Sequence, residues 1–465
     1  MLGRIPDDAA KRISERAWRE LARRLSGRLL RPGDPRFVDV ARPHNLRYAK
    51  VLPAGIARCR SSNEVAQAIL WCREHDVPLA ARSGGHSYAG FSTTRGLMID
   101  VGAMNATRFN AAEETITIDG GARNGDLYKA LPATGMTITH GRCPTVGAAG
   151  FLLGGGIGFN MRALGVGCDQ LVATDIVTAD GNLQTVNAHD DLFWACCGGG
   201  GGNFGINTSF TVRTFPTAPV TVFRMAWNVN SEEVFAALMR ALDAAPSGLG
   251  ARVSLGAPRQ RDEKRDVPVR LLGQLKGSAR ELADILAPVP PGSSTEIFEK
   301  SYWDGQAFLE EPGPPEYFQE RSTFLTGTLD SNALATAFDW LRRWPGTSVG
   351  ADLRFFQTGG KINERAADAT AYVHRNNRWL MLIGLGWEAC DPPDLLRQNR
   401  AWQDGFYQAM LPYGTGGAYQ NFADPSLNDW GHAYYGANFE RLRRVKAAVD
   451  RKMLFQFAQA IPPAE

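Results

Sequence analysis

Short segments with strand-like and helix-like periodicity alternate along the first 215 residues. After Ser62, apolar side chains recur every three or four positions as far as His75, and this pattern predicts an amphipathic helix. Strict alternation of apolar and polar residues at 115–119 predicts a half-buried strand. We expect further strands at 77–81 and 96–101, a short helix at 126–131, and a hairpin at 174–186 that turns at Asp180 and Gly181. This mixture is typical of an α/β or α+β domain.

A proline-rich stretch at 216–219 marks a plausible boundary, after which polar helices alternate with strands as far as residue 412. A helix is predicted at 231–245, with Ser231 as its N-cap and two glutamates in its first turn, and another at 332–344. The apolar run at 380–387 predicts a buried strand. We therefore expect one antiparallel sheet with helices on one side. The tail that follows is aromatic and loop-rich, and becomes helical at 438–450.

Composition and charge exclude several classes of protein. Apolar residues make up 44% of the chain and charged residues 21%, which rules out wholesale disorder. The 51 basic and 48 acidic residues leave a net charge of +3, too balanced to predict a nucleic-acid partner or an electrostatic membrane anchor. No apolar run reaches the roughly 18 residues of a transmembrane helix, and no secretory signal is visible. We expect a cytoplasmic protein whose seven cysteines are mostly free, buried thiols.

Glycine is over-represented, with 50 of 465 residues, and the excess gathers in three clusters. The first cluster, at 82–90, follows a predicted strand and reads Arg-Ser-Gly-Gly-His-Ser-Tyr-Ala-Gly. Consecutive glycines allow positive φ angles, so that several backbone N–H groups can point into one hollow and bind phosphate oxygens. His86 lies inside this loop and away from any periodic apolar face, which makes it a candidate functional residue.

The second cluster, at 141–158, contains Cys143 in a glycine-flanked turn, where a thiol is available for chemistry. The third, at 198–206, contains a GxGxxG pattern from Gly200 to Gly205. A Rossmann fold would also need an acidic residue about 20 positions later, and none occurs between 206 and 231. The sequence also lacks GxxxxGK[ST], HExxH, GxSxG and zinc-type cysteine spacing, so we expect neither a P-loop nor a metal site.

Together, the segments 82–90, 143–158 and 198–206 resemble the PCMH-type FAD-binding domain of the vanillyl-alcohol-oxidase superfamily. They most resemble its berberine-bridge-enzyme-like FAD-linked oxidases, and the tail at 419–424, 434–438 and 442–450 is similar to the same group. The resemblance covers nearly the whole chain. It implies an α+β fold with a two-part FAD-binding domain, residues 1–215 and 413–465, and a substrate-binding domain, residues 216–412, with an antiparallel sheet flanked by helices.

The resemblance also implies where FAD binds. The flavin would be bonded through its 8α-methyl group to His86 and through a second link to Cys143, and residues 82–87 would hold the pyrophosphate. Two such links would raise the redox potential of the flavin and hold it in an open site. The other positions matched to FAD-binding residues are Arg82, Ser83, Gly84, Gly85, Ser87, Gly90, Thr145, Val146, Gly147, Gly150, Gly154, Gly155, Gly158, Gly205, Ile206, Asn421 and Asn438.

Two tyrosines are candidate catalytic residues on the same resemblance. Tyr419 matches a base that takes the substrate's hydroxyl proton while a hydride passes to the flavin, and Tyr88 matches a substrate-contacting tyrosine. An ordinary phenol titrates near pH ~10, so Tyr419 needs a hydrogen-bond donor or a positive field nearby. Val146 matches the family's oxygen gate, where a small side chain is similar to members that reduce O₂. We therefore expect O₂ as electron acceptor and hydrogen peroxide as a product.

Several positions depart from the family pattern. Phe422 replaces a second tail tyrosine, and the segment 355–361 carries no acidic residue where sugar-oxidising members often have one. The second departure argues against oligosaccharide oxidation. Aromatic residues of the second region either line an apolar substrate pocket or fill the core of its sheet; they are Tyr302, Trp303, Phe356, Tyr372 and Trp387.

The expected function is an FAD-dependent oxidase acting on a small-molecule alcohol or ring carbon, in a secondary metabolite or a sugar-like alcohol. Two alternatives stay open at this point. One is a dehydrogenase on the same scaffold that uses another electron acceptor. The other is a flavin-loaded binding protein without turnover.

Overall fold

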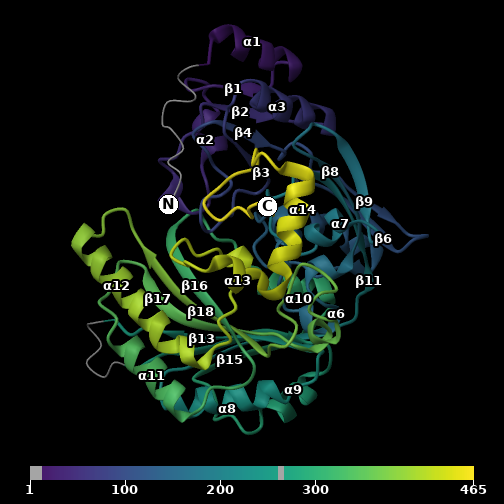
Figure 1. The fold of residues 1–465 in the computed structure, drawn as a ribbon. Coiled ribbons are helices and arrows are strands. Elements are labelled where there is room, and N and C mark those ends of the chain that lie inside the picture. The colour runs from purple at the N-terminus through teal and green to yellow at the C-terminus, as the bar shows by residue number, and fades with distance from the viewer. Residues whose placement is uncertain (1–12, 260–265) are drawn as a thin grey trace.

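The structure is a computed structural model that describes residues 13–259 and 266–465. Figure 1 shows the N-terminal sheets at the top, a large sheet with helices beneath it at the bottom, and the yellow C-terminal segment between them. The order of helices and strands confirms the expected α+β fold class.

The first region contains two separate sheets. One has four strands in the order β1-β2-β4-β3, of which β2, β4 and β3 run parallel, and α3 (Ser62–Glu74) packs on it. The other has five antiparallel strands in the order β5-β6-β10-β8-β9. The strands are β1 (Leu29–Leu30), β2 (Gly55–Arg58), β3 (Leu79–Arg82), β4 (Leu97–Asp100), β5 (Thr107–Asn110), β6 (Thr115–Asp119), β8 (Leu171–Val177), β9 (Leu183–Asn187) and β10 (Ile206–Arg213), with a small pair β7 (Met136–Thr137) and β11 (Phe215–Pro216).

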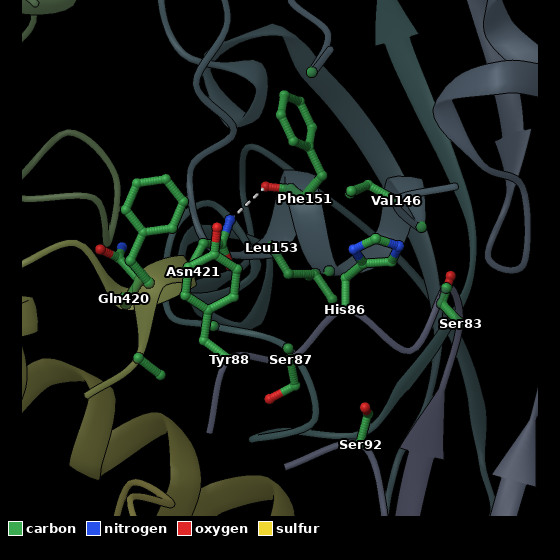
Figure 2. Close-up of a pocket in the computed structure, with 18 of the residues that line it drawn as sticks. Ser83, His86, Ser87, Tyr88, Ser92, Val146, Phe151, Leu153, Gln420 and Asn421 are labelled. Carbon is green, nitrogen blue, oxygen red and sulfur yellow. Dashed lines mark hydrogen bonds between the residues drawn. The ribbon is translucent and has the colours of Figure 1, made fainter. Parts of the chain in front are cut away.

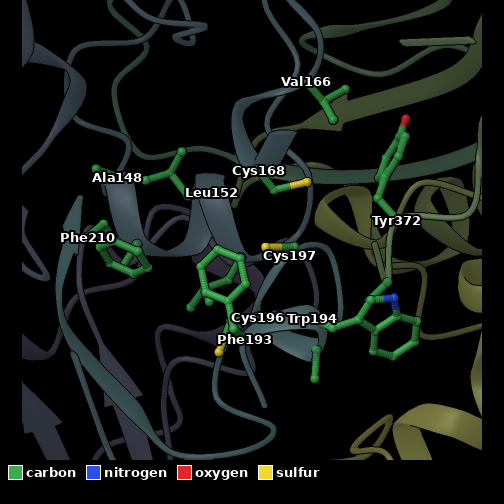
Figure 3. Packing of buried hydrophobic residues seen from close by; sticks show 14 of the residues in the cluster. Ala148, Leu152, Val166, Cys168, Phe193, Trp194, Cys196, Cys197, Phe210 and Tyr372 are labelled. Atoms are coloured by element: carbon green, nitrogen blue, oxygen red, sulfur yellow. The ribbon is translucent and has the colours of Figure 1, made fainter. Parts of the chain in front are cut away.

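Short apolar helices fill the space behind the five-stranded sheet. Leu152 of α5 (Ala148–Leu153) and Phe193 of α7 (Asp191–Cys196) belong to one hydrophobic cluster with Phe210 of β10, part of which Figure 3 shows. The glycines that flank α5 keep this helix short, so that its ends become loops. The remaining helices of this region are α1 (Glu15–Arg24), α2 (Phe37–Ala41), α4 (Asn124–Ala130) and α6 (Met161–Leu164).

The second region is a seven-stranded antiparallel sheet in the order β15-β12-β14-β13-β17-β18-β16. Along β18, Met381 and Ile383 pack in the cluster on the helix-covered face, whereas Leu380 and Leu382 pack in the cluster on the opposite face. This double burial explains the unbroken apolar run of the strand. The strands are β12 (Val220–Trp227), β13 (Leu249–Gly256), β14 (Val269–Leu275), β15 (Ser294–Lys300), β16 (Tyr317–Leu325), β17 (Gly350–Gln357) and β18 (Trp379–Trp387). The covering helices are α8 (Ser231–Asp243), α9 (Ala279–Leu286), α11 (Ser331–Arg342) and α12 (Pro393–Met410), and α10 (Tyr302–Leu309) packs on the other face.

The tail returns to the first region through α13 (Trp430–Tyr435) and α14 (Phe439–Asp450). The buried Lys446 Nζ on α14 donates to the Asn203 carbonyl at 2.6 Å and pairs with Asp450 at 2.7 Å. Asp424 pairs with Arg321 of β16 at 2.8 Å, which ties the tail to the large sheet as well. One hydrophobic cluster contains residues from 1–215, 216–412 and 413–465, so the three segments share a core. The domain boundaries expected at 216 and 412 stay a prediction.

Three helix starts lie one or two residues from the predictions: α4 begins at Asn124 rather than 126, α11 at Ser331 rather than 332, and α14 at Phe439 rather than 438. Ser61 caps α3, which begins at Ser62, and Asp330 caps α11 through the backbone N–H of Ala333 at 2.8 Å. Ser231 is not the N-cap of α8, because Asn230 occupies that position and the Ser231 hydroxyl donates to the Val267 carbonyl. The expected cap was wrong because a bond to a neighbouring strand competes for the same hydroxyl.

The cysteines are free, as predicted, and most of them are buried. Within residues 13–259 and 266–465, no helix combines the length and apolar character needed to cross a membrane.

Candidate functional site

A cavity of about 690 Å³ opens where the first region, the seven-stranded sheet and the tail meet. Figure 2 shows His86 and Val146 on one side of it and Tyr88 and Asn421 on the other. Most of the residues predicted to bind FAD or substrate line this cavity. They are Arg82, Ser83, Gly84, Gly85, His86, Ser87, Tyr88, Cys143, Val146, Gly147, Gly150, Gly158, Gly205, Ile206, Tyr419 and Asn421.

Two glycine loops touch each other on one wall of the cavity. A Cβ atom on Gly84 would clash with the backbone nitrogen of Gly147, and one on Gly147 would clash with the nitrogen of Gly84. Gly85 adds a positive φ of 76° in the left-handed region that favours glycine. The glycines therefore allow the loop after β3 to meet the loop before α5 backbone to backbone.

Arg82 has a structural role in this loop. Its guanidinium donates to the carbonyls of Ser92 at 2.8 Å, Arg42 at 3.2 Å and Ala41 at 3.3 Å. Burial lowers its pKa to about 10, which leaves it charged at neutral pH. With its donors used in this way, Arg82 organises the loop rather than offering a free charge to a ligand.

His86 and Cys143 come together through Thr145. The Thr145 Oγ1 lies 2.9 Å from His86 Nε2 and 3.2 Å from Cys143 Sγ. The His86 ring also stacks on His44, with centroids 3.9 Å apart. Burial, together with neighbouring positive groups, lowers the pKa of His86 to about 3, so the imidazole is neutral and one of its ring nitrogens carries no proton.

Tyr419 is buried, with 1% of its surface exposed, and its phenolic oxygen faces two hydrogen-bond donors. The backbone N–H of Gly156 lies 2.9 Å from this oxygen and the Asn421 side-chain amide 3.1 Å from it. Donors of this kind stabilise a phenolate. Burial acts in the opposite direction and raises the pKa of Tyr419 above its ordinary value.

Tyr88 lies within an aromatic group on the same cavity. Its ring stacks on Phe422 at 4.9 Å and meets the edge of Phe318 at 4.8 Å. Burial raises its pKa well above the ordinary value, and the negative charge of Glu320 adds to the effect. Phe422 also lines the cavity. It is the residue that replaces the second tail tyrosine of the family pattern.

Several polar atoms on the cavity wall lack a partner within the described part of the chain. They include Ser83 Oγ, Ser92 Oγ and Asn124 Oδ1, all buried. A buried polar atom without a hydrogen bond is costly, so these atoms indicate a polar ligand. FAD carries phosphates and hydroxyl groups along its length, and the glycine loops leave room for its backbone contacts. The residues present fit this cofactor.

Some predicted residues do not line the cavity and instead support it. Asn438 donates to the carbonyls of Ala367 at 2.7 Å and Thr370 at 3.1 Å. Gly90 packs closely against the ring of Tyr48. The other members of this group are Thr145, which bridges His86 and Cys143, Gly154, which packs against Asn421, and Gly155, which packs against Tyr372.

Of the aromatic residues considered for the substrate pocket, Phe356 lines the cavity. The other four pack in or against hydrophobic clusters: Tyr302, Trp303, Tyr372 and Trp387. Phe356 is thus a pocket residue, and the other four aromatic residues have a packing role.

Charged residues on the sheet side of the cavity were missed from sequence. Arg142 and Arg252 both pair with Glu311, and Arg354 pairs with Glu320. Arg252 and Arg354 alternate with buried apolar residues along β13 and β17, a pattern that is typical of a strand with one face in water. Only the position of the first region over this face turns the polar positions into a cavity wall.

Comparison with known proteins gives the same class as the fold and the cavity. Residues 53–187 match a family described as "FAD binding domain", and residues 418–462 match "Berberine and berberine like". An uncharacterised FAD-linked oxidoreductase of Bacillus subtilis, YgaK, is 33% identical over 95% of this chain and 98% of its own length. A xylooligosaccharide oxidase of Thermothelomyces thermophilus is 30% identical over 89% of this chain and 88% of its own.

The solved structure of Physcomitrella patens BBE-like 1 aligns with a TM-score of 0.85 and 25% identity, over 96% of this chain and 99% of that one. The glycine loops, the orphaned polar atoms and these similarities together define an FAD-linked oxidoreductase. The chain belongs to the berberine-bridge-enzyme-like family, with the α+β PCMH-type fold that the sequence predicted.

Proposed function

We propose that the protein is an oxidase that carries FAD covalently bonded to both His86 and Cys143. It would oxidise a small-molecule alcohol or ring carbon and pass the electrons to O₂, giving hydrogen peroxide. The single observation that carries the proposal is the position of Thr145, whose hydroxyl oxygen contacts both His86 Nε2 at 2.9 Å and Cys143 Sγ at 3.2 Å. Two nucleophiles thus share one wall of a cavity that fits FAD.

In this proposal the chain's own residues hold the cofactor and the substrate. The backbone around Gly84 and Gly147, with Ser83 and Ser92, binds the polar part of FAD. Bound FAD supplies the hydride acceptor. Tyr88, fixed between Phe318 and Phe422, contacts the substrate.

Tyr419 is proposed as the base that removes the substrate's hydroxyl proton. Its oxygen accepts hydrogen bonds from Gly156 and Asn421, and these donors stabilise the phenolate before the proton arrives. The burial that raises its pKa means that the phenolate depends on those two donors. A phenolate held in this way accepts the substrate's hydroxyl proton and becomes the neutral phenol.

The substrate class in this proposal is a secondary metabolite or a sugar-like alcohol. The similar xylooligosaccharide oxidase supports the sugar-like alcohol of this pair. The cavity supports it too, because aromatic faces lie beside charged side chains there. Gln357, which lines the cavity in place of an acidic residue, argues against an oligosaccharide in particular.

The covalent links are tested by peptide mapping. The purified protein is denatured in acid, the flavin that stays with the chain is measured, and its attachment is located by mass spectrometry. His86→Ala is expected to keep flavin on Cys143, Cys143→Ala to keep it on His86, and the double variant to release it. Cys390→Ala, which changes an exposed cysteine, serves as the matched control.

Flavin retained by the double variant would refute the assignment of the links. Flavin on His86 alone in the unchanged protein would reduce the proposal to a singly linked enzyme. Flavin that is bound but never reduced by a panel of alcohols would favour the binding protein without turnover.

The electron acceptor is tested by reoxidation of the reduced protein. Val146 lines the cavity, and its small side chain supports access of O₂. Stopped-flow measurements are expected to give faster reoxidation with O₂ than with quinones or dyes, and Val146→Leu is expected to slow the O₂ reaction selectively. The reverse order of rates in the unchanged protein would identify a dehydrogenase.

A further inference from the structure

A cluster of three charged side chains lies on the seven-stranded sheet; Glu320 is buried, and Glu320 and Arg354 line the cavity. Arg354 of β17 pairs with Glu320 of β16 at 2.6 Å and with Asp352 at 2.9 Å. The strand between them, β18, carries Gly384 at this point, and a Cβ atom there would clash with the Arg354 guanidinium. The glycine therefore lets Arg354 reach across a whole strand to Glu320. With both carboxylates ionised, the cluster carries one negative charge; burial raises the pKa of Glu320, and the Arg354 guanidinium opposes that shift.

Glu320, which lines the cavity, has a carboxylate oxygen without a hydrogen-bond partner among the described residues. Its side chain is 7% exposed and its Oε1 is bonded to Arg354, but Oε2 is buried with no partner among the described residues. The neighbouring wall consists of the aromatic rings of Tyr88, Phe318 and Phe356. A buried carboxylate oxygen beside aromatic faces matches a protonated amine, which binds both the charge and the ring faces.

A second cluster, with the opposite net charge, lies on the same cavity. Arg142 pairs with Glu311 at 2.5 Å, and Arg252 pairs with the same carboxylate at 2.7 Å. Two guanidiniums and one carboxylate leave one positive charge. Among the described residues, Arg142 uses only Nη1 in this pairing, and its guanidinium lies 5.6 Å from the ring of Phe356. The rest of the Arg142 fork is available for a ligand carboxylate.

We propose that the substrate is a small zwitterion, whose ammonium group binds Glu320 and whose carboxylate binds Arg142. This rests on the proposed function in so far as the cavity is the substrate site. A neutral ligand would leave Glu320 Oε2 without a charged donor and the Arg142 fork without an anion. A ligand with one charge would satisfy one cluster alone. The proposal concerns substrate recognition, and the proton transfer assigned to Tyr419 is unchanged by it.

Binding of four probes with one skeleton tests this proposal. The zwitterion is para-aminomethylbenzoate, the cation is its methyl ester, the anion is para-methylbenzoate, and the neutral member is para-methylbenzamide. Affinities for the flavin-loaded protein are measured by calorimetry, which reads binding whether or not turnover occurs. Hydrogen bonds to charged groups are stronger than those to neutral groups, so each charge is expected to tighten binding about tenfold or more, with the zwitterion tightest.

Two variants should give opposite patterns. Glu320→Gln is expected to remove the advantage of the ammonium group and leave that of the carboxylate. Arg142→Gln is expected to do the reverse. Arg224→Gln removes one partner of an exposed ion pair elsewhere and is expected to change neither. If Arg142→Gln does not fold, Glu311→Gln replaces it and is expected to tighten the anion, because it removes the carboxylate that competes for both arginines.

Equal affinities for all four probes would overturn the proposal, as would equal effects of Glu320→Gln on the cation and the anion. These results are distinguishable from a failure of the proposed function. If the protein carries no covalent flavin but Glu320→Gln and Arg142→Gln still have opposite effects on the cation and the anion, the zwitterion site is supported and the covalent oxidase is refuted. If the protein carries both flavin links but binds all four probes equally, the covalent attachment is supported and the zwitterion site is refuted.

Discussion

At the scale of single residues, the cavity is organised by hydrogen bonds between segments far apart in the chain. Tyr419 in the tail meets the N–H of Gly156, and His86 meets Cys143 only through Thr145. The sequence identified these residues through motifs, because each motif needs a particular residue type in a glycine-rich turn. It did not reveal that the Arg82 guanidinium donates its hydrogen bonds to backbone carbonyls, because those carbonyls lie 10 and about 40 positions away along the chain.

Replacing Tyr419 with phenylalanine tests the proposed base. Loss of the phenolic oxygen removes the group that takes the substrate proton, and general-base catalysis of this kind contributes roughly 10²–10⁴-fold. We therefore expect Tyr419→Phe to lower the rate of flavin reduction at least about 10²-fold, measured by anaerobic stopped-flow absorbance. Tyr413→Phe, outside the cavity lining, is the control. An unchanged rate in Tyr419→Phe would remove this residue from the mechanism.

At the scale of helices, strands and loops, periodicity predicted several elements in both regions. The strand at 115–119 is β6, the hairpin at 174–186 is β8 and β9, and the apolar run at 380–387 lies in β18. Helix starts were less well predicted, because neighbouring serines compete for the cap and tertiary contacts decide between them. The contact between the two glycine loops was not predictable, since it joins segments about 60 residues apart.

Gly84→Ala tests that contact between the loops. The new Cβ atom would collide with the backbone of Gly147, which cannot move without displacing α5. Overpacking of this kind costs ~1–3 kcal/mol, so we expect a lower unfolding temperature and a lower ratio of flavin to protein. Gly327→Ala is the matched control, because a Cβ atom there meets nothing within 4 Å. Full flavin content in Gly84→Ala would show that the loops separate without harm to the site.

At the scale of the whole molecule, histidines are buried where regions meet. His140 in the first region lies 2.8 Å from the Tyr302 hydroxyl of α10, and His374, which stacks on Phe324 of β16 at 4.1 Å, lies beside Gly417 of the tail. Burial lowers the pKa of His140 to about 4 and that of His374 to about 3. Both imidazoles are therefore neutral in the folded protein at pH values where an unfolded histidine, with a pKa near ~6.5, takes up a proton.

The free energy of unfolding should consequently depend on pH. Below about pH 6.5 the unfolded chain binds more protons than the folded one, so stability is full above that value and falls as the pH drops toward about 4. Each such histidine contributes a slope of up to ~1.4 kcal/mol per pH unit. We expect urea unfolding between about pH 7 and pH 5 to show this loss and His374→Phe to reduce its slope. His189→Gln, at an exposed histidine, should leave the slope unchanged; an unchanged slope in His374→Phe would contradict the assignment.

The sequence by itself determined the fold class, the cofactor class and the residues of the glycine loops. These follow from local requirements: strand and helix periodicity, positive φ at glycines, and motif residues whose order along the chain is specific. Only the tertiary structure decided which of these residues share a cavity and which support it from behind, as Asn438 does. It also decided that the polar faces of β13, β16 and β17 line a cavity rather than an open surface, because burial of a strand face depends on what packs over it.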